Sequence, residues 1–325
     1  MNPWDSWFES LNLETRNALI NYVNSKSETE VTLTREKTED LYVVNPPVYV
    51  DVHELFPLYD HLAFGPNMLL KGPKGDGKTL SILSYAHSKD IPVVTIECSE
   101  STRESALIGN FFLKGKETAF VLGKMPTAID VANEVGKCIL VFEEFNALTP
   151  QVQKSVNALL DFRKFVTIPQ IGKTYRLEEG CKLWIVATMN PSVYGGTYDL
   201  NEDLKSRLEE VEVGYPPPAL EKTLIKEVTN TKISQELIDR VVMLATETRQ
   251  PGLTYSLSPR DVIRLVNSME LFGAASSDPA TVDAALNVAL QLVICKFEDS
   301  DRETIKKRVE SIFKGVNVNT KWRGI

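Results

Sequence analysis

The sequence predicts an α/β fold in which a parallel sheet carries helices on both faces and is followed by a smaller all-helical lid domain. Two observations predict it. Between residues 46 and 217, short continuous apolar runs alternate with stretches of helical periodicity, a pattern typical of a parallel sheet buried on both sides. After the break "YPPP" at 215–218, the remaining chain has helical periodicity almost throughout.

Five apolar runs are the expected strands of the sheet. They are the segments 67–70, 92–97, 138–142, 183–188 and 209–214. Further along the chain, apolar residues recur at helical spacing in the expected lid helices. These are the segments 219–230, 234–249, 258–275, 281–297 and 301–316.

The chain therefore divides into three predicted parts. Residues 1–45 are polar and charged and form an N-terminal arm, in which "WFESLNLETRNALINYV" is expected to be helical. We expect Trp4 and Trp7 to pack this arm either onto the body or onto a neighbouring subunit. Residues 46–217 form the α/β domain, and residues 218–325 form the lid domain with the C-terminal helices.

Composition predicts a folded cytoplasmic protein. Of 325 residues, 43% are hydrophobic and 25% charged, and no run approaches the roughly 20 apolar residues that span a bilayer. The N-terminus "MNPWDSWFES" lacks the basic and apolar regions of a secretory signal. The net charge of -8 argues against tight binding to nucleic acid. The four cysteines form no CxxC pair, so we expect free thiols.

The strongest motif is "GPKGDGKT", which follows the first predicted strand and precedes a helical stretch. It has the spacing of a phosphate-binding loop, whose glycines let backbone N–H groups turn towards the phosphates. In this interpretation Lys78 reaches the β- and γ-phosphates of ATP, and the Thr79 hydroxyl holds Mg²⁺. The alternative is a glycine-rich turn without a ligand. The predicted cofactor-binding residues are Gly72, Pro73, Lys74, Gly75, Asp76, Gly77, Lys78, Thr79 and Leu80.

A second apolar run, "CILVFEEF", ends in two acidic residues. The carboxyl ends of parallel strands form the edge at which ligands bind in open α/β sheets. We therefore expect Glu143 to bind Mg²⁺ together with Thr79, and Glu144 to polarise the attacking water as a general base. The alternative is that two acids simply open a loop.

Three further polar residues are candidates for catalysis. Asn190 ends the run "LWIVATMN", where it would orient the water or contact the γ-phosphate; a buried turn-capping asparagine is the alternative. Arg207 precedes the last predicted strand. Arg260 lies in the first turn of a lid helix, where the helix dipole disfavours a cation unless an anionic ligand is near. The alternative for each arginine is a surface ion pair with a nearby acid: Glu209, Glu210, Asp261 or Glu270.

Together these motifs resemble the AAA+ ATPases over residues 46–275. The order of the phosphate loop, "VFEEFN", "ATMNP", "LKSRL" and "LSPRDVIRLV" carries the resemblance. Three stretches make it more similar to the MoxR-type and dynein-related group, which includes the NorQ, CbbQ, GvpN and CobS proteins. They are an insertion in the second helix that contains "LIGNFFLKGKE", a hairpin with "FVTIPQIGKTYR", and the segment "SPRD".

The resemblance implies a role for each candidate residue. The loop "GPKGDGKT" corresponds to Walker A, and Glu143 with Glu144 corresponds to Walker B. Asn190 corresponds to sensor 1 and Arg260 to sensor 2. Arg207 corresponds to the arginine finger, which acts on the ATP of a neighbouring subunit. The family usually has Asp at the position of Glu143, so the extra methylene is expected to shift the water shell of Mg²⁺ and slow turnover.

The resemblance also implies assembly and partners. A finger supplied by a neighbour implies a ring of identical subunits, most often a hexamer in this family. Hydrolysis would move the lid and relay that motion to a protein client, often together with a von Willebrand A-domain partner. We expect the insert around Phe111 and Phe112 and the hairpin at 168–173 to face the pore or a partner.

Three other functions remain open from the sequence. One is a nucleic-acid motor subunit like the McrB-like restriction translocases, against which the acidic charge argues. Another is a nucleotide-binding assembly factor with weak hydrolysis, which Glu143 favours. A metabolite kinase would explain the phosphate loop but neither the arginines nor the helical lid.

Overall fold

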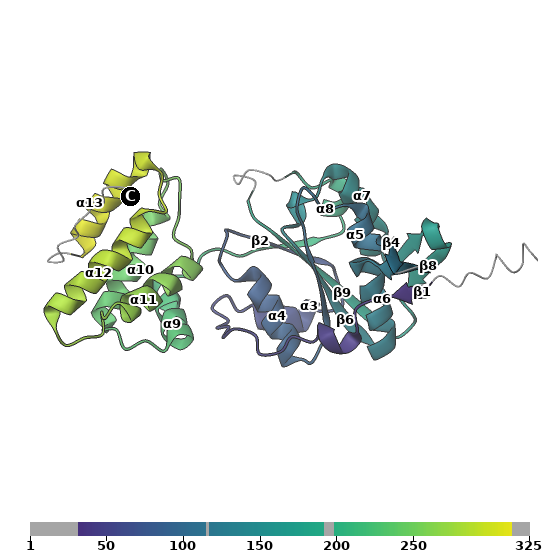
Figure 1. Ribbon diagram of the computed structural model, residues 1–325, viewed down its shortest axis with the longest axis horizontal. Coiled ribbons are helices and arrows are strands. Elements are labelled where there is room, and N and C mark those ends of the chain that lie inside the picture. The colour runs from purple at the N-terminus through teal and green to yellow at the C-terminus, as the bar shows by residue number, and fades with distance from the viewer. Residues whose placement is uncertain (1–31, 115–116, 192–197, 314–325) are drawn as a thin grey trace, which may run out of the picture.

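The structure, a computed structural model, describes residues 32–114, 117–191 and 198–313. An α/β part and a helical part are joined by the segment 213–217, which forms neither helix nor strand (Figure 1). The helix predicted near the N-terminus, with Trp4 and Trp7, lies outside the described residues.

Five parallel strands form the central sheet, in the order β10-β2-β9-β6-β3. In that order their bounds are Glu209–Glu212, Met68–Lys71, Lys182–Met189, Lys137–Glu143 and Val93–Glu97. The predicted α/β fold with its five strands is confirmed, and the strand ends differ by only one or two residues from those expected. Because β2 has a strand on either side, the phosphate loop that follows it leaves from the interior of the sheet.

Helices cover both faces of the sheet because successive strand residues point into two different hydrophobic cores. In β2, Met68 and Leu70 belong to the core shared with α3 (Leu55–Leu62) and α4 (Lys78–Ser88). Leu69 between them belongs to the opposite core. That core is closed by α5, α6 and α7, with bounds Glu104–Ile108, Lys124–Val135 and Pro150–Leu160 (Figure 1).

A β-hairpin interrupts the second helical segment of the α/β part. Strands β4 (Gly109–Lys114) and β5 (Glu117–Leu122) pair antiparallel between α5 and α6. A short strand β1 (Thr32–Thr34) pairs parallel with β5, and Arg35 then forms an ion pair with Asp130 of α6 at 3.2 Å. Part of the segment predicted as an arm is thus bound to the α/β body through β1 and Arg35, neither of which the sequence analysis singled out.

A second hairpin precedes β9, as the resemblance implies. It consists of β7 (Phe165–Ile168) and β8 (Lys173–Arg176), which pair antiparallel. Short helices complete the described elements of the α/β part. They are η1 (Thr38–Leu41), η2 (Phe145–Ala147), η3 (Pro169–Ile171) and α8 (Glu202–Lys205).

The C-terminal part is helical, as predicted. Its helices are α9 (Pro218–Thr229), α10 (Gln235–Thr248), α11 (Pro259–Leu271), α12 (Pro279–Ile294) and α13 (Asp299–Ile312). They bury a hydrophobic core of their own, separate from the two cores of the sheet. The domain limits at 45/46 and 217/218 stay predictions. Within the described ranges, no helix is long and apolar enough to cross a membrane.

Candidate functional site

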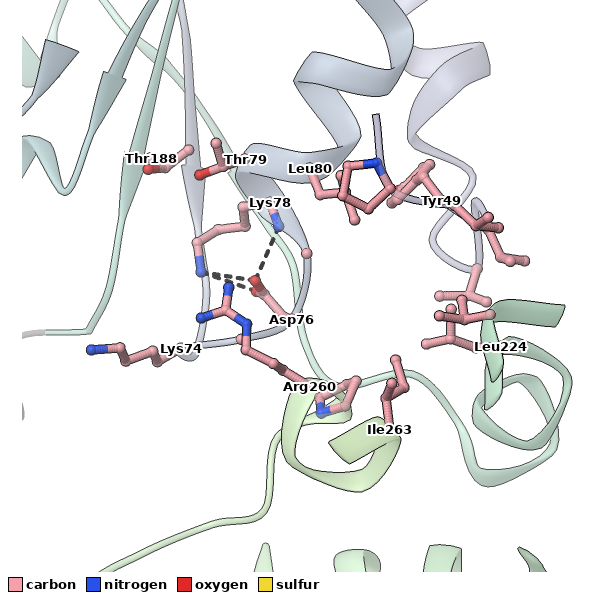
Figure 2. A pocket seen from close by; sticks show the side chains of 18 of the residues that line it. Tyr49, Lys74, Asp76, Lys78, Thr79, Leu80, Thr188, Leu224, Arg260 and Ile263 are labelled. Carbon is pink, nitrogen blue, oxygen red and sulfur yellow. Dashed lines mark hydrogen bonds and ion pairs between the residues drawn. The ribbon is translucent and has the colours of Figure 1, made fainter. Parts of the chain in front are cut away.

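A cavity of about 430 Å³ lies at the carboxyl edge of the sheet, between the α/β part and the lid. Its lining comes from the phosphate loop, from the segment before α3 and from lid helices α9 and α11 (Figure 2). Most of the predicted site residues meet here. Those that line the cavity are Lys74, Gly75, Asp76, Gly77, Lys78, Thr79, Leu80, Glu143, Glu144, Asn190 and Arg260.

The loop Gly72–Thr79 needs its glycines for two physical reasons. Gly75 and Gly77 have φ of 80° and 98°, in the left-handed region that side chains other than glycine rarely adopt. Gly72 has no room for a side chain, because a Cβ there would lie 2.0 Å from the carbonyl oxygen of Val213. Helix α4 then begins at Lys78, so that its N-terminal end faces the cavity. This is the geometry that binds phosphate in proteins.

The ammonium group of Lys78 is buried against the loop. It donates hydrogen bonds to the carbonyl oxygens of Gly72 at 2.8 Å and Pro73 at 2.7 Å, and to the carboxylate of Asp76 at 3.0 and 3.1 Å. The side chains of Lys78 and Asp76 are only 6% and 1% exposed. Burial lowers the pKa of Lys78 and raises the pKa of Asp76, because it penalises both charges.

Thr79 and Glu143 bring two oxygen atoms together beside the loop. Glu143 ends β6, and its Oε2 accepts a hydrogen bond from the Thr79 hydroxyl at 3.3 Å. Burial raises the pKa of the Glu143 carboxyl, and the Thr79 hydrogen bond opposes that shift. Hydroxyl and carboxylate oxygens are suited to Mg²⁺, which typically keeps water and takes its remaining ligands from phosphate. In the described part of the chain, no group of three or more His, Cys, Asp or Glu side chains forms a separate metal site.

Glu144 is exposed at the edge of the cavity, one residue beyond the strand. Its backbone is left-handed, with φ of 54°, a sparsely populated conformation for a residue with a side chain. The backbone N–H of Glu144 donates to the Thr188 hydroxyl of β9 at 3.3 Å. This contact joins the ends of two neighbouring strands.

Asn190 connects the loop with Glu144. Its Oδ1 accepts from the Lys78 ammonium, and its Nδ2 donates to a Glu144 carboxylate oxygen, both at 3.4 Å. Its own carbonyl accepts from Asn146 at 3.1 Å. The Asn190 side chain therefore spans two site residues, which the turn-capping alternative does not explain.

Arg260 extends from the lid into the cavity. Figure 2 shows its guanidinium directed towards Asp76 and Lys78 of the loop. The neighbouring Asp261 is engaged elsewhere, since its carboxylate accepts from Ser258, Tyr255 and Lys296. Among the described residues, no ion pair joins Arg260 to Asp261 or Glu270. An exposed cation in the first turn of α11 is thus placed beside the cavity.

Arg207 lies at the opposite end of the strands from the cavity, where the strands begin. It precedes β10, and its backbone oxygen accepts from Asn67 at 3.0 Å. Asn67 lies before β2 and Gly72 after it, and the four residues of β2 span about 13 Å. This length of strand separates Asn67 from the phosphate loop. The guanidinium donates to the Asp203 carbonyl, and no described contact pairs it with Glu209 or Glu210. Arg207 is therefore absent from the lining of this chain's own cavity.

The sequence did not point to the apolar wall of the cavity. That wall comes from three distant segments, and nothing local distinguishes its members from core residues. Its members are Pro47, Val48, Tyr49, Val50, Val52, Leu224, Val228 and Ile263. Arg264 also lines the cavity. The sequence could have predicted it, because Arg260 is a candidate and residues four apart share a helix face.

Comparison with known proteins finds a family that part of this chain resembles. Residues 67–208 match the AAA domain (dynein-related subfamily). The matched segment runs from the start of β2 to the start of β10 and contains the phosphate loop, Glu143, Glu144 and Asn190. This segment is therefore similar to the AAA domains of that subfamily.

Bacterial proteins are similar to longer stretches of this chain. YojN of Bacillus subtilis, described as uncharacterized, is 31% identical over 196 residues, which are 59% of this chain and 62% of YojN. The chain thus matches less than two thirds of YojN. An uncharacterized protein of Staphylococcus epidermidis is 28% identical over 277 residues, 82% of this chain and 95% of its own length. A crystal structure of a candidate ATPase from Cytophaga hutchinsonii is 18% identical, covers 94% of this chain and 99% of its own, and has a TM-score of 0.45.

Proposed function

We propose that this protein hydrolyses ATP with Mg²⁺ as a MoxR-type AAA+ remodelling ATPase. One observation carries the proposal. Lys78, Thr79, Glu143, Glu144 and Asn190 come from three strand ends and converge on one cavity, with Arg260 opposite them. The set contains donors for phosphate, oxygen ligands for Mg²⁺ and a carboxylate for water, which is what ATP hydrolysis requires.

The cavity provides separate surroundings for the two ends of ATP. The loop and the N-terminal end of α4 would hold the phosphates through backbone N–H groups and Lys78. Val48, Leu224 and Ile263 belong to the apolar wall, which would take the flat face of the base. Arg264 lies on the same helix as Arg260 and is a further candidate for contact with the nucleotide.

Thr79 and Glu143 would hold Mg²⁺ together with the phosphates. The ion, when bound, neutralises charge that develops on the phosphate oxygens. Glu144 would orient the attacking water and accept its proton, and Asn190 would fix the direction of the Glu144 carboxylate through their hydrogen bond. Arg260 would contact the phosphates from the lid, so that hydrolysis and lid position are coupled.

Arg207 would act on the ATP of a neighbouring subunit. Its absence from the lining of its own cavity supports this, because a ring built from repeated head-to-tail contacts lets each subunit present a residue to the site of the next. We therefore propose a ring homo-oligomer, with a hexamer as the expected size. A protein client and a von Willebrand A-domain partner are proposals that follow from the MoxR resemblance. Location in the cytoplasm is a proposal that follows from the composition. The exposed Phe112 and Leu113 of the β4–β5 hairpin support a contact of that hairpin with a client.

The test is steady-state ATPase activity against protein concentration for the wild type, Glu144→Gln and Arg207→Ala. Specific activity is expected to rise with concentration, because sites are complete only between subunits. Glu144→Gln is expected to lower the rate by about 10²–10⁴-fold, and Arg207→Ala by about 10³-fold or more, while ATP binding is retained. Lys205→Ala, which removes an exposed cation from the same segment, is the matched control.

Two results would count against the proposal. A wild type that binds ATP without hydrolysing it favours the assembly-factor alternative. Activity that is independent of concentration and unaffected by Arg207→Ala removes the case for a shared site.

A further inference from the structure

Asp76 places a carboxylate inside the phosphate loop. Its side chain is 1% exposed, although it lines a cavity that otherwise has the features of an anion site. Anions bind at such loops because backbone N–H groups and the helix N-terminus are electropositive. A buried negative charge on the loop itself opposes that attraction. Asp76 was predicted to bind the cofactor only as a member of the loop, and the proposed hydrolysis assigns no role to its side chain.

The contacts of Asp76 show what this carboxylate occupies. Its Oδ1 accepts from the backbone N–H of Lys78 at 3.2 Å, and both of its oxygens accept from the Lys78 ammonium. Figure 2 shows the carboxylate inside the curve of the loop, with the backbone nitrogen and the ammonium of Lys78 both directed at it. These two groups are the donors that a phosphate would use. The carboxylate thus occupies part of the position that a phosphate of the ligand would occupy.

The ammonium of Lys78 has no donor to spare. It has three protons. Its acceptors are the Gly72 and Pro73 carbonyls, the Asp76 carboxylate and the amide oxygen of Asn190. A phosphate must therefore replace one of them. The Asp76 carboxylate is the one anion in this described set, and it would repel a phosphate at close range in surroundings where charge is poorly screened.

We infer that Asp76 is an intramolecular competitor of the nucleotide's β-phosphate for the backbone N–H and ammonium of Lys78. The inference rests on the proposed function, because it concerns the same nucleotide site. Asp76 weakens the binding of ADP and ATP relative to a loop with a neutral residue at this position. It also satisfies the loop's donors when the site is empty, so that product release leaves no buried donor unpaired.

Isothermal titration of the full chain with ADP and with ATP, both with Mg²⁺, tests the inference. Asp76→Asn and Asp76→Thr are expected to bind both nucleotides about tenfold more tightly than the wild type, since a competing charged hydrogen bond is removed. Glu212→Gln is the matched control, because it removes one exposed negative charge at the end of β10 without touching Lys78, and its affinity is expected to stay within about twofold. Adenosine, which lacks phosphates, is expected to bind all four proteins equally.

Each outcome decides the matter. Unchanged or weaker binding of ADP by both Asp76 variants, with thermal unfolding showing that they are folded, overturns the inference and makes Asp76 a support of the loop. An equal gain for adenosine also overturns it, because the effect then lies outside the phosphate site. If neither the wild type nor any variant binds ADP or ATP, the proposed function fails and the inference falls with it.

Discussion

At the scale of single residues, the surroundings of Lys164 change its chemistry. It follows α7 with a left-handed backbone of φ 42°, and its ammonium donates to the side-chain oxygen of Asn67. Asn67 in turn donates to the carbonyls of Leu160 at 2.7 Å and Arg207 at 3.0 Å. Burial lowers the pKa of Lys164 to about 8. One half-buried amine and one amide thus join three segments beside the proposed finger.

This shift in pKa predicts how stability depends on pH. Lys164 ionises at about 8 in the folded protein and near its ordinary value of 10.5 when unfolded. Between these values the unfolded chain holds a proton that the folded chain has released, so the contribution of Lys164 to stability rises with pH. The free energy of unfolding of the wild type relative to Lys164→Met is expected to rise by no more than about 3 kcal/mol from pH 7.5 to pH 10. Urea unfolding at both pH values measures it, and parallel behaviour of the two proteins would contradict it.

At the scale of elements, a buried ion pair holds the lid helices together. Arg249, next after α10, donates from two nitrogens to the Glu221 carboxylate of α9 at 2.7 and 2.6 Å. The Glu221 side chain is 0% exposed. Arg249 also donates to the Leu257 carbonyl and lies over the ring of Tyr215, 4.3 Å from its centroid. The pair therefore connects α9, α10, the segment before α11 and the segment that leads into the lid.

Breaking this pair is expected to destabilise the lid. Arg249→Leu leaves the Glu221 carboxylate buried without its cation, which typically costs about 3–5 kcal/mol. The matched control is Arg240→Leu, which breaks the exposed pair with Glu236 on α10 and is expected to cost less than about 0.5 kcal/mol. Thermal and urea unfolding measure both variants. Equal effects of the two substitutions would show that burial of Glu221 does not govern lid stability.

At the scale of the whole molecule, the two ends of the strands have different tasks in the proposed ring. The cavity with Lys78, Glu143 and Glu144 lies at the carboxyl ends of the strands, and Arg207 lies at their amino ends. A subunit can therefore lose one half of a site and keep the other. This division can be tested by combining two inactive variants.

Mixtures of Glu144→Gln and Arg207→Ala are expected to regain ATPase activity that neither variant has alone. A site is complete when its own subunit has Glu144 and its neighbour has Arg207. In randomly assembled rings with equal amounts of the two variants, about a quarter of the sites meet this condition. The expected ATPase activity is therefore about a quarter of that of the wild type. Activity is measured after subunits are mixed at low concentration and then concentrated. Failure to regain activity at any ratio, with rings present by light scattering, would exclude a site shared in this way.

The features that the sequence predicted are local ones, and those that it missed depend on contacts between distant segments. Strands and helices were predictable because apolar periodicity reports burial over a few neighbouring residues. The loop at Gly72–Thr79 was predictable from its spacing, since its backbone geometry is local. Glu143 and Asn190 were predictable as neighbours because carboxyl ends of parallel strands share one edge. The roles of Arg207 and Arg260 came from resemblance and stay predictions.

What the sequence by itself determined is therefore the class of fold, the five strands of the central sheet, the helices of the C-terminal part and the place of the glycine-rich loop after the first of those strands. Only the tertiary structure decided that Asp76 turns into the loop towards Lys78, and that Val48, Leu224 and Ile263 meet in one wall. It also placed Arg207 beside Asn67, 140 residues away and far from the cavity. The physical reason is that periodicity records how each segment is buried, whereas the path of the chain selects which buried segments meet.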